Sequence, residues 1–274
     1  MPAGTSLALI PSQLSSGAGW HWNSIGYIQV DGDGAVLDGF QNTDGISVEA
    51  SNVTIKNCLL NLNTSGNTLG SHSGAGIVIR NGTSNVTIQN CEIFGSGTGC
   101  DRLEVGIKSQ DMVTGNRSIG NNIYHTTTGV QIDEGLIQDN YIHDFGFCNW
   151  GAPAGPDHLN GTTSNAVTGF LTIQHNTIFN DFDQTDAVSL FEDFGAQYDR
   201  LVTNNLLAGG GYAIYGGANP GGQPTHNIKI TNNRIARIFH ATGGSFGPLA
   251  AFDPSGADNL WSNNVWDDTS EIIP

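Results

Sequence analysis

The sequence has little charge, very little positive charge and no long hydrophobic run. Charged residues make up 12% of the 274 residues, and nine Lys and Arg residues stand against twenty-five Asp and Glu residues, which gives a formal net charge of −16. A chain this acidic lacks the Lys and Arg surface that nucleic-acid phosphates and anionic membranes require. No apolar run approaches the roughly 18 residues that cross a bilayer. We therefore expect neither a nucleic-acid partner nor membrane insertion.

The sequence also lacks an intact signal peptide and any Cys-x-x-Cys pair. It opens with Met-Pro-Ala-Gly rather than with a charged stretch followed by a long apolar one. We expect a mature domain, secreted and monomeric, from which any export signal has been removed. The spacing of the four cysteines does not fit a zinc site, and we expect no resident cofactor.

Glycine is abundant, with 38 residues or about twice the usual share, and no long stretch shows the 3.6-residue periodicity of a helix. Instead one pattern recurs eight times: an aliphatic or aromatic residue, any residue, a polar residue and then Asn or Cys. Ile88-Gln89-Asn90-Cys91 and Ile173-Gln174-His175-Asn176 are two copies. The fourth positions, 18 to 36 residues apart, are Cys58, Cys91, Asn122, Asn140, Asn176, Asn205, Asn233 and Asn264.

Short strands lie between these copies, many beginning with glycine and an aliphatic residue, as in Gly76-Ile77-Val78-Ile79. Two or three short strands in each unit of about 29 residues indicate a parallel β-solenoid, whose coils stack at about 4.8 Å. A β-propeller needs four strands per blade of about 40 residues, and a two-sheet sandwich would not repeat so regularly. The repeated Asn would bond the backbone and its own equivalent one coil away. We expect Asn122, Asn140, Asn176, Asn205 and Asn233 to form one continuous interior row.

The alternation of Gly-Ile-x-Val strands with Asn-Val-Thr-Ile-x-Asn-Cys strands resembles the right-handed parallel β-helix, or pectate-lyase-like, superfamily, including its secreted actinobacterial members. The resemblance implies an all-β, single-domain solenoid of about eight to nine coils. We assign residues 35–274 to it and residues 1–34 to an N-terminal cap that covers the first edge strand. The superfamily includes lyases, hydrolases, epimerases and non-catalytic adhesins, so the fold leaves the function open.

The four cysteines fall into two kinds. Cys58 and Cys91 share one position of the repeat and are expected to be buried free thiols. Cys100 and Cys148 follow their repeat positions by nine and eight residues, so both leave a similar corner. We expect a disulfide between them, as is common in exported proteins.

Acidic residues gather in the middle coils. Aligning the strands on their glycine step places Asn160 and Asp186 in one column, with Asp157 and Asp183 each three residues earlier. The alignment therefore predicts stacked carboxylates about 5 Å apart, one of which would have a raised pKa and act as an acid. Turn-capping aspartates are the alternative explanation. The candidate catalytic residues here are Asp157, His158, Asp186, Glu192 and Asp193, with Asn160 and Asp183 as substrate-binding residues.

Lys108 is the one basic residue in the aligned columns, and Gln131 follows it one coil later. A lyase of the pectate-lyase type would use such a lysine as base, with calcium on nearby carboxylates. Trp150, Tyr212 and Tyr215 are candidate platforms for sugar rings. Asn42-Thr43-Asp44-Gly45 is similar to a motif of polygalacturonase-type hydrolases, but the other motifs of that family are missing.

These observations predict a secreted enzyme that degrades an extracellular polysaccharide. Hydrolysis by Asp157 and Asp186, with His158 orienting, is the first hypothesis. A uronate lyase that uses Lys108, with possible calcium, is the second. A non-catalytic solenoid that binds glycan is the third.

Overall fold

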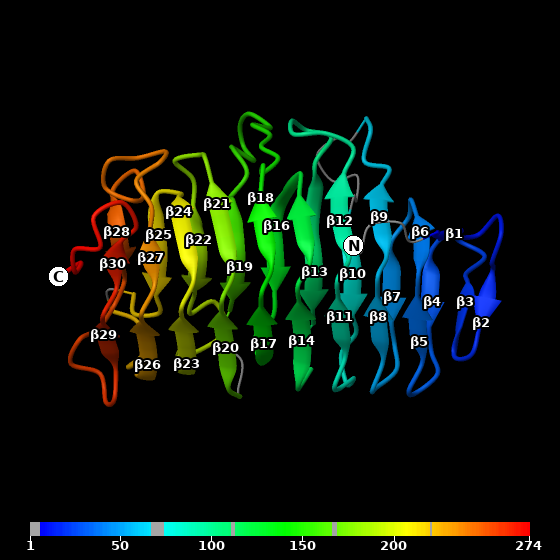
Figure 1. Ribbon diagram of the computed structural model, residues 1–274, viewed down its shortest axis with the longest axis horizontal. Coiled ribbons are helices and arrows are strands. Elements are labelled where there is room, and N and C mark those ends of the chain that lie inside the picture. The colour runs from blue at the N-terminus through cyan, green and yellow to red at the C-terminus, as the bar shows by residue number, and fades with distance from the viewer. Residues whose placement is uncertain (1–5, 67–73, 111–112, 166–168, 220) are drawn as a thin grey trace.

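The computed structural model describes residues 6–66, 74–110, 113–165, 169–219 and 221–274, and in this part of the chain it is built from strands arranged in three sheets (Figure 1). Sheet A contains, in spatial order, β1 (Ala8–Leu9), β6 (Phe40–Asn42), β9 (Leu59–Leu62), β12 (Glu92–Gly95), β15 (Asn122–Tyr124), β18 (Tyr141–His143), β21 (Thr177–Asn180), β24 (Leu206–Gly209), β27 (Arg234–Ile235) and β30 (Val265–Trp266). Sheet B contains β2 (Ser16–Gly17), β3 (Trp20–Trp22), β4 (Ile28–Val30), β7 (Ile46–Val48), β10 (Ala75–Ile79), β13 (Leu103–Ser109), β16 (Thr126–Gln131), β19 (Asn160–Ser164), β22 (Asp186–Leu190), β25 (Tyr212–Gly216) and β28 (Gly247–Ala250). Sheet C contains β5 (Val36–Asp38), β8 (Thr54–Lys56), β11 (Thr87–Gln89), β14 (Asn116–Ile119), β17 (Gly135–Gln138), β20 (Leu171–Gln174), β23 (Tyr198–Thr203), β26 (His226–Thr231) and β29 (Leu260–Ser262).

The chain visits sheet B, sheet C and sheet A in turn and then returns to sheet B, and each strand pairs in parallel with its equivalent in the next coil. Counted over the described residues from β4 to β30, this circuit is completed nine times. The fold is therefore the expected right-handed parallel β-helix. In Figure 1 the strands of sheet C form the lower row, and those of sheet A lie in front of sheet B. Among the described residues, no helix could span a membrane.

The first coils begin before residue 35. Strand β1 pairs in parallel with β6, and β4 pairs in parallel with β7. Strands β2, β3 and β4 are joined by antiparallel pairing instead. The segment assigned to a cap thus contributes strands to the solenoid itself.

Columns of aliphatic side chains fill the interior. One column runs through successive strands of sheet B and is fully buried; its members are Ile77, Ile107, Val130, Thr162, Val188 and Ile214, of which only Thr162 is polar. Such side chains each stabilise the fold by about 1.5–3 kcal/mol through burial. The same register repeats from coil to coil because every strand presents its apolar residues to one face.

The corner between sheets C and A is tight and carries the asparagine row. From β8 onward, two residues separate each sheet C strand from the following sheet A strand. The first of the two has a left-handed backbone, with φ between 53° and 63°, at Asn57, Asn90, Gly120, Asp139, His175, Asn204, Asn232 and Asn263. Asn and Gly tolerate this conformation better than other residues. The second residue points inward.

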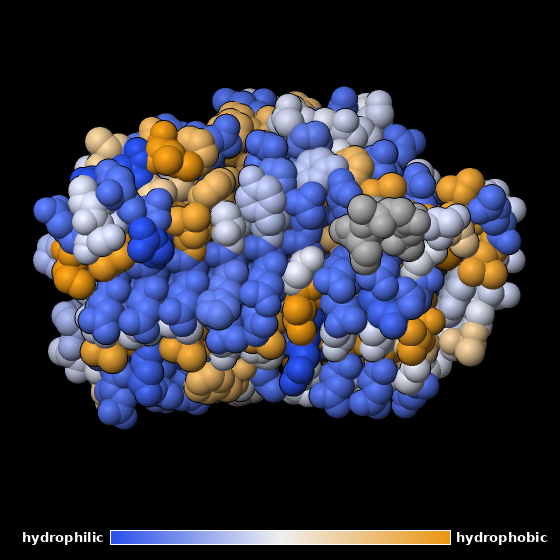
Figure 2. Space-filling model, in the orientation of Figure 1, coloured by the Kyte–Doolittle hydropathy of each residue, from blue (hydrophilic) through white to orange (hydrophobic). Residues whose placement is uncertain are grey.

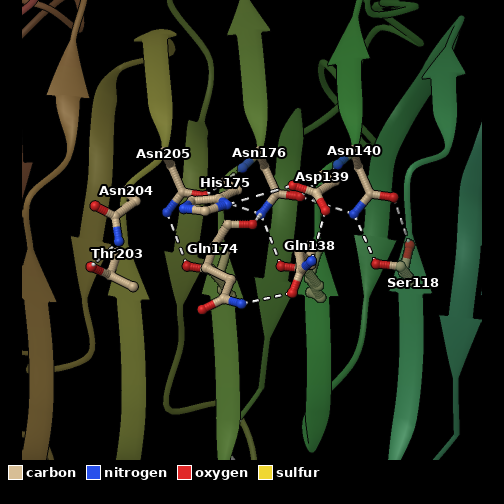
Figure 3. Close-up of polar contacts among 12 residues, drawn as sticks. Ser118, Gln138, Asp139, Asn140, Gln174, His175, Asn176, Thr203, Asn204 and Asn205 are labelled. Carbon is tan, nitrogen blue, oxygen red and sulfur yellow. Dashed lines mark hydrogen bonds and ion pairs between the residues drawn. The ribbon is translucent and has the colours of Figure 1, made fainter.

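Buried side-chain amides form a continuous ladder at this corner (Figure 3). Asn140 Nδ2 donates to Asn176 Oδ1 at 2.9 Å, Asn176 to Asn205 at 3.0 Å and Asn205 to Asn233 at 2.9 Å. Each Nδ2 also donates to a strand carbonyl, as Asn176 does to Ile137 O at 2.9 Å. The ladder satisfies polar groups that would otherwise be buried without partners. Cys58 and Cys91 occupy the same corner as buried free thiols, as expected.

One rung of the ladder was predicted wrongly. Asn121, not Asn122, is the buried member: its Nδ2 donates to Asn140 Oδ1 at 3.0 Å, and its Oδ1 accepts from the Cys91 amide at 2.9 Å. Asn122 opens β15 and contacts His143 Nε2 through Oδ1 at 2.9 Å. The register explains the shift, because Ser118 rather than Ile119 pairs with the interior Ile88.

Longer connections occur at the two corners that flank sheet B. Residues 144–159 join β18 to β19 on one side, and residues 191–197 join β22 to β23 on the other. These connections lie at the two ends of the sheet B strands. Figure 2 shows the opposite face, formed by sheets A and C, where a hydrophilic band follows the tight corner. The long connections make the outer face of sheet B the place for a groove.

Candidate functional site

Two polar columns cross the outer face of sheet B, as the sequence alignment predicted. A Cβ atom built on Gly106, Gly129 or Gly161 would lie 2.3–2.7 Å from an interior isoleucine methyl group, so each glycine faces the interior. The residue before each glycine and the residue two places after it point outward. The register confirms the first column as Val105, Thr128, Asn160, Asp186 and Tyr212. It confirms the second as Lys108, Gln131, Thr163, Ser189 and Tyr215.

Asp186 is the central residue of this face. Its side chain is fully buried, and Oδ2 accepts a 2.8 Å hydrogen bond from Asn160 Nδ2. Oδ1 has no hydrogen-bond partner among the described residues. Burial raises the pKa of Asp186 well above its usual value, and hydrogen bonds from Asn160 and Ser189 offset this only in part. Burial therefore favours the protonated form of Asp186 relative to an exposed aspartate, and one oxygen is left for another partner.

The turn before β22 holds Asp186 in place. Asn180 is fully buried, and its Nδ2 donates to Gln184 O at 2.8 Å and to Asp186 O at 3.0 Å. The backbone amide of Asp186 donates to Leu159 O at 3.0 Å. Gly210 packs over the strand with φ +76°, and a Cβ there would lie 2.6 Å from Asp186 Cα. This position accepts only glycine, so the close packing that buries Asp186 is built into the sequence.

A group of aromatic rings lies on the strand next to Asp186 and in the adjoining connections. The rings of Tyr212 and Tyr215 lie 5.5 Å apart, and Phe246 lies 5.8 Å from Tyr212. Phe191 lies 5.6 Å from Tyr215. The pKa of Tyr215 is raised by burial, by Asp186 and by Tyr212, so its phenol remains a proton donor. Phe246, next to Tyr212, is 71% exposed, and an exposed aromatic ring suits the apolar face of a sugar.

Asp157 does not belong to this group, and its proposed role as an acid was wrong. Its carboxylate receives Arg102 Nε at 2.8 Å and Nη2 at 2.9 Å, Trp150 Nε1 at 2.8 Å and the Cys148 amide at 2.8 Å. Burial opposes ionisation, but these hydrogen bonds outweigh it and lower the pKa of Asp157. A carboxylate with both oxygens occupied and a low pKa holds two loops together instead.

The disulfide reinforces the same junction. Cys100 and Cys148 are bonded, with Cα atoms 4.6 Å apart, which confirms the expected pairing. Arg102 follows Cys100 by two residues, so the disulfide and the ion pair join the same two loops. Trp150 is part of this junction and not a free platform, because its indole donates to Asp157 and the Arg102 guanidinium lies 5.3 Å from its ring centre.

The remaining predicted residues are dispersed over the face. His158, Asp183 and Asp193 are exposed and, among the described residues, have no side-chain hydrogen bond or ion pair, and Asp183 has no contact of that kind with Asp157. Glu192 follows β22 and has a buried Oε1 without a hydrogen-bond partner in the described part of the chain. Lys108 lies three strands from Asp186 and Gln131 two, so neither belongs to the group around Asp186. Within the described ranges, no three His, Cys, Asp or Glu residues are placed to hold a metal ion.

Sequence reasoning missed Phe246, Phe194 and the contribution of Ser189. Phe194 and Phe246 are each 71% exposed and lie in the connections on opposite sides of sheet B. Both are outside the repeat, so no periodicity pointed to them. Ser189 Oγ accepts from Asn160 Nδ2 at 3.3 Å and donates to Thr163 Oγ1 at 3.0 Å, which links the two columns.

No protein-family model matches this sequence, and no curated protein matches it. Among solved structures, the crystal structure of pectate lyase Pel9A is similar, with a TM-score of 0.41 and 16% sequence identity. The match covers 87% of this chain and 54% of that one, so this chain spans about half the length of that protein.

Proposed function

We propose that this protein cleaves a polysaccharide in the groove on the outer face of sheet B, with Asp186 as the proton donor. The observation that carries the proposal is the environment of Asp186: its carboxyl group is fully buried, one oxygen is unpartnered among the described residues, and burial raises its pKa. A carboxylic acid kept neutral by burial is what glycoside hydrolysis needs to protonate a leaving-group oxygen.

The reaction also needs a second carboxylate. Asp183 is exposed and lies three residues before Asp186, on the turn that Asn180 holds. We assign it the task of activating water or attacking the sugar directly. Asn160 keeps the Asp186 carboxyl oriented through its 2.8 Å hydrogen bond. Because Asp186 has no exposed surface, the proposal requires a neighbouring side chain to move before substrate reaches it.

The test is release of new reducing ends from a panel of plant, algal and bacterial polysaccharides, with products analysed by mass. Wild-type protein should release hydrolytic products, and Asp186→Asn should reduce the rate by about 10²–10⁴-fold. Asp193→Asn, which removes an exposed carboxylate in a connection outside the cluster, is the matched control and should retain activity. Equal activity in the two variants would show that Asp186 is not the proton donor. Binding without release from any polymer would identify a non-catalytic glycan-binding solenoid.

A uronate lyase is the second candidate, and one observation favours it. The neutral Asp186 carboxyl group and the Asn160 amide lie side by side and could together stabilise the charge of a uronate carboxylate during β-elimination. Lys108 lies three strands from Asp186, so a lyase at this pair needs a base other than Lys108. An unsaturated product, lighter than the hydrolytic one by a water molecule, would decide for the lyase.

We also propose export from the cell. The disulfide between Cys100 and Cys148 supports this, because such bonds persist in oxidising compartments.

A further inference from the structure

A polar cavity lies at the edge of sheet B where its strands end. Its volume is about 360 Å³, and its lining includes Asn81, Lys108, Gln131, Asp133, Asn165 and Phe194. These residues come from five successive coils. None of them contacts Asp186 through a hydrogen bond or ion pair within the described residues. The cavity is thus separate from the proposed catalytic group.

Polar side chains face this cavity without partners. The side-chain amides of Asn81, Gln131 and Asn165 and the ammonium group of Lys108 make no hydrogen bond or ion pair to any residue that the structure describes. Several unpaired donors and acceptors converging on one cavity indicate a ligand that supplies both kinds of group.

The wall of the cavity is held rigidly. Asp133 Oδ1 accepts from Ser164 Oγ at 3.0 Å and from the Asn165 amide at 2.6 Å. The buried Arg200 lies within the electrostatic field of Asp133, which raises the arginine pKa against the larger lowering effect of burial. The Phe194 amide donates to Asn165 O at 3.1 Å, which fixes the backbone of a phenylalanine whose ring is 71% exposed. An exposed ring next to unpaired amides suits a sugar ring and its hydroxyl groups.

The charges of the cavity favour an uncharged sugar. Lys108 and Asp133 contribute one positive and one negative charge, so the lining has no excess of either sign. The amides provide donors and acceptors together, as hydroxyl groups require. A chain with a net charge of −16 also repels polyanions at long range.

The cavity and Asp186 lie on one path. The column Lys108, Gln131, Thr163 and Ser189 leads from the cavity to the Asn160 and Asp186 pair. Lys108 lies on β13 and Asp186 on β22, three strand spacings apart, or about 14 Å at 4.8 Å per coil. A single glycan chain can therefore occupy both places at once.

We propose that this cavity is a distal subsite that binds one uncharged sugar unit of the glycan cleaved at Asp186, so that the substrate is a neutral polysaccharide. The inference rests on the proposed function. The proposed subsite requires affinity to rise sharply when an oligosaccharide becomes long enough to reach from Asp186 to the cavity. Phe194 and Gln131 should then be needed for this rise in affinity.

The experiment measures binding by calorimetry in the Asp186→Asn background, where no cleavage complicates the result. The probes are cello-, xylo- and manno-oligosaccharides of two to six units, with oligogalacturonides of the same lengths as acidic counterparts. One neutral series should bind, with at least a tenfold gain from short to long members. Phe194→Ala and Gln131→Ala should each remove most of that gain and leave the binding of disaccharides unchanged. Phe170→Ala, which removes a 52% exposed ring that does not line the cavity, is the control and should change nothing.

Tighter binding of oligogalacturonides than of every neutral series, abolished by Lys108→Met, would overturn the neutral substrate class. Failure of every neutral series to bind would overturn it too. Equal weakening at all lengths, or none, in the Phe194 and Gln131 variants would overturn the distal subsite. The proposed function fails separately, by unchanged cleavage in Asp186→Asn, so the two failures are distinguishable.

Discussion

The Asn160 side chain donates a 2.8 Å hydrogen bond to Asp186 Oδ2 from the neighbouring strand, and the other oxygen of Asp186 accepts none from the described residues. This pair sets the chemistry of the outer face of sheet B. The amide fixes the orientation of the carboxyl group, and burial keeps its proton on.

Replacing Asp186 by asparagine should abolish most activity without unfolding the protein. The amide has the same shape and removes the cost of a buried ionisable group. We expect a rate at least 100-fold lower and a melting temperature equal to or above that of the wild type. Rates on an identified polymer and thermal unfolding curves test the two expectations. A large loss of both stability and activity would mean that Asp186 serves the fold alone.

The free energy of unfolding should depend on pH through the carboxyl group of Asp186. The pKa of Asp186 is 3.8 in its ordinary state and is raised by burial in the folded protein, so the folded chain retains a proton that the unfolded chain has released. Its contribution is complete below about pH 3.8 and is lost as the pH rises through the raised pKa. Asp186→Asn should therefore gain stability relative to the wild type by about 1.4 kcal/mol per pH unit in that window. Urea unfolding of both proteins from pH 4 upward measures this, and parallel curves would contradict it.

The ion pair between Arg102 and Asp157 should be structural. Their side chains are 9% and 8% exposed, so Asp157→Asn removes a buried ion pair and leaves a neutral side chain against the Arg102 guanidinium. We expect a loss of about 3–5 kcal/mol in the free energy of unfolding at neutral pH. Because the pKa of Asp157 is lowered, this contribution is present above the unfolded value and disappears as the pH falls through the folded one. A variant with full stability but no activity would restore Asp157 to the catalytic group.

Removal of the disulfide should loosen the same loops. The bond joins residues 48 positions apart, and a loop of that length corresponds to about 4 kcal/mol in the chain-entropy model. We expect the Cys100→Ser, Cys148→Ser double variant to lose about 2–4 kcal/mol. Chemical denaturation with and without reductant gives the value. An unchanged midpoint would show that the ion pair suffices.

Two adjacent asparagines should differ sharply in their importance. Asn121→Ala removes a rung of the buried ladder and leaves the Cys91 amide and the Ile88 carbonyl short of partners. We expect a loss of about 3 kcal/mol or more, since each unsatisfied buried group costs about 1–3 kcal/mol. Asn122→Ala, its matched control, removes a contact with His143 at the surface and should cost less than about 1.5 kcal/mol. Equal losses would place both residues in the interior row.

The repeat made the fold predictable, because each coil of about 30 residues needs the same residue types at its tight corner, and these recur along the sequence. It did not fix every register. Asn121 and Asn122 are the same residue type, and the interior position that precedes them is filled by Ser118 instead of an aliphatic residue. Ser118 Oγ donates to Asn140 Oδ1 at 3.1 Å, so this serine points into the interior. A pattern of alternating apolar and polar residues predicts that a serine points outward.

The site was predictable only where it follows the repeat. Asn160 and Asp186 lie in strands, so alignment placed them side by side. Asp157 lies in a long connection, where its partner Arg102 comes from a different coil 55 residues away. Contacts between irregular loops leave no period in the sequence. Phe194 and Phe246 were missed for the same reason.

Stacking gives this groove a fixed unit of length. The distance from the cavity at Lys108 to the acid at Asp186 is set by how many coils separate them, and each coil adds one rise and one amide rung. Excising one whole coil between the two would draw them closer by a single step of about 4.8 Å while the remaining rungs re-pair. The number of coils between Lys108 and Asp186 would therefore determine how long a glycan must be to contact both.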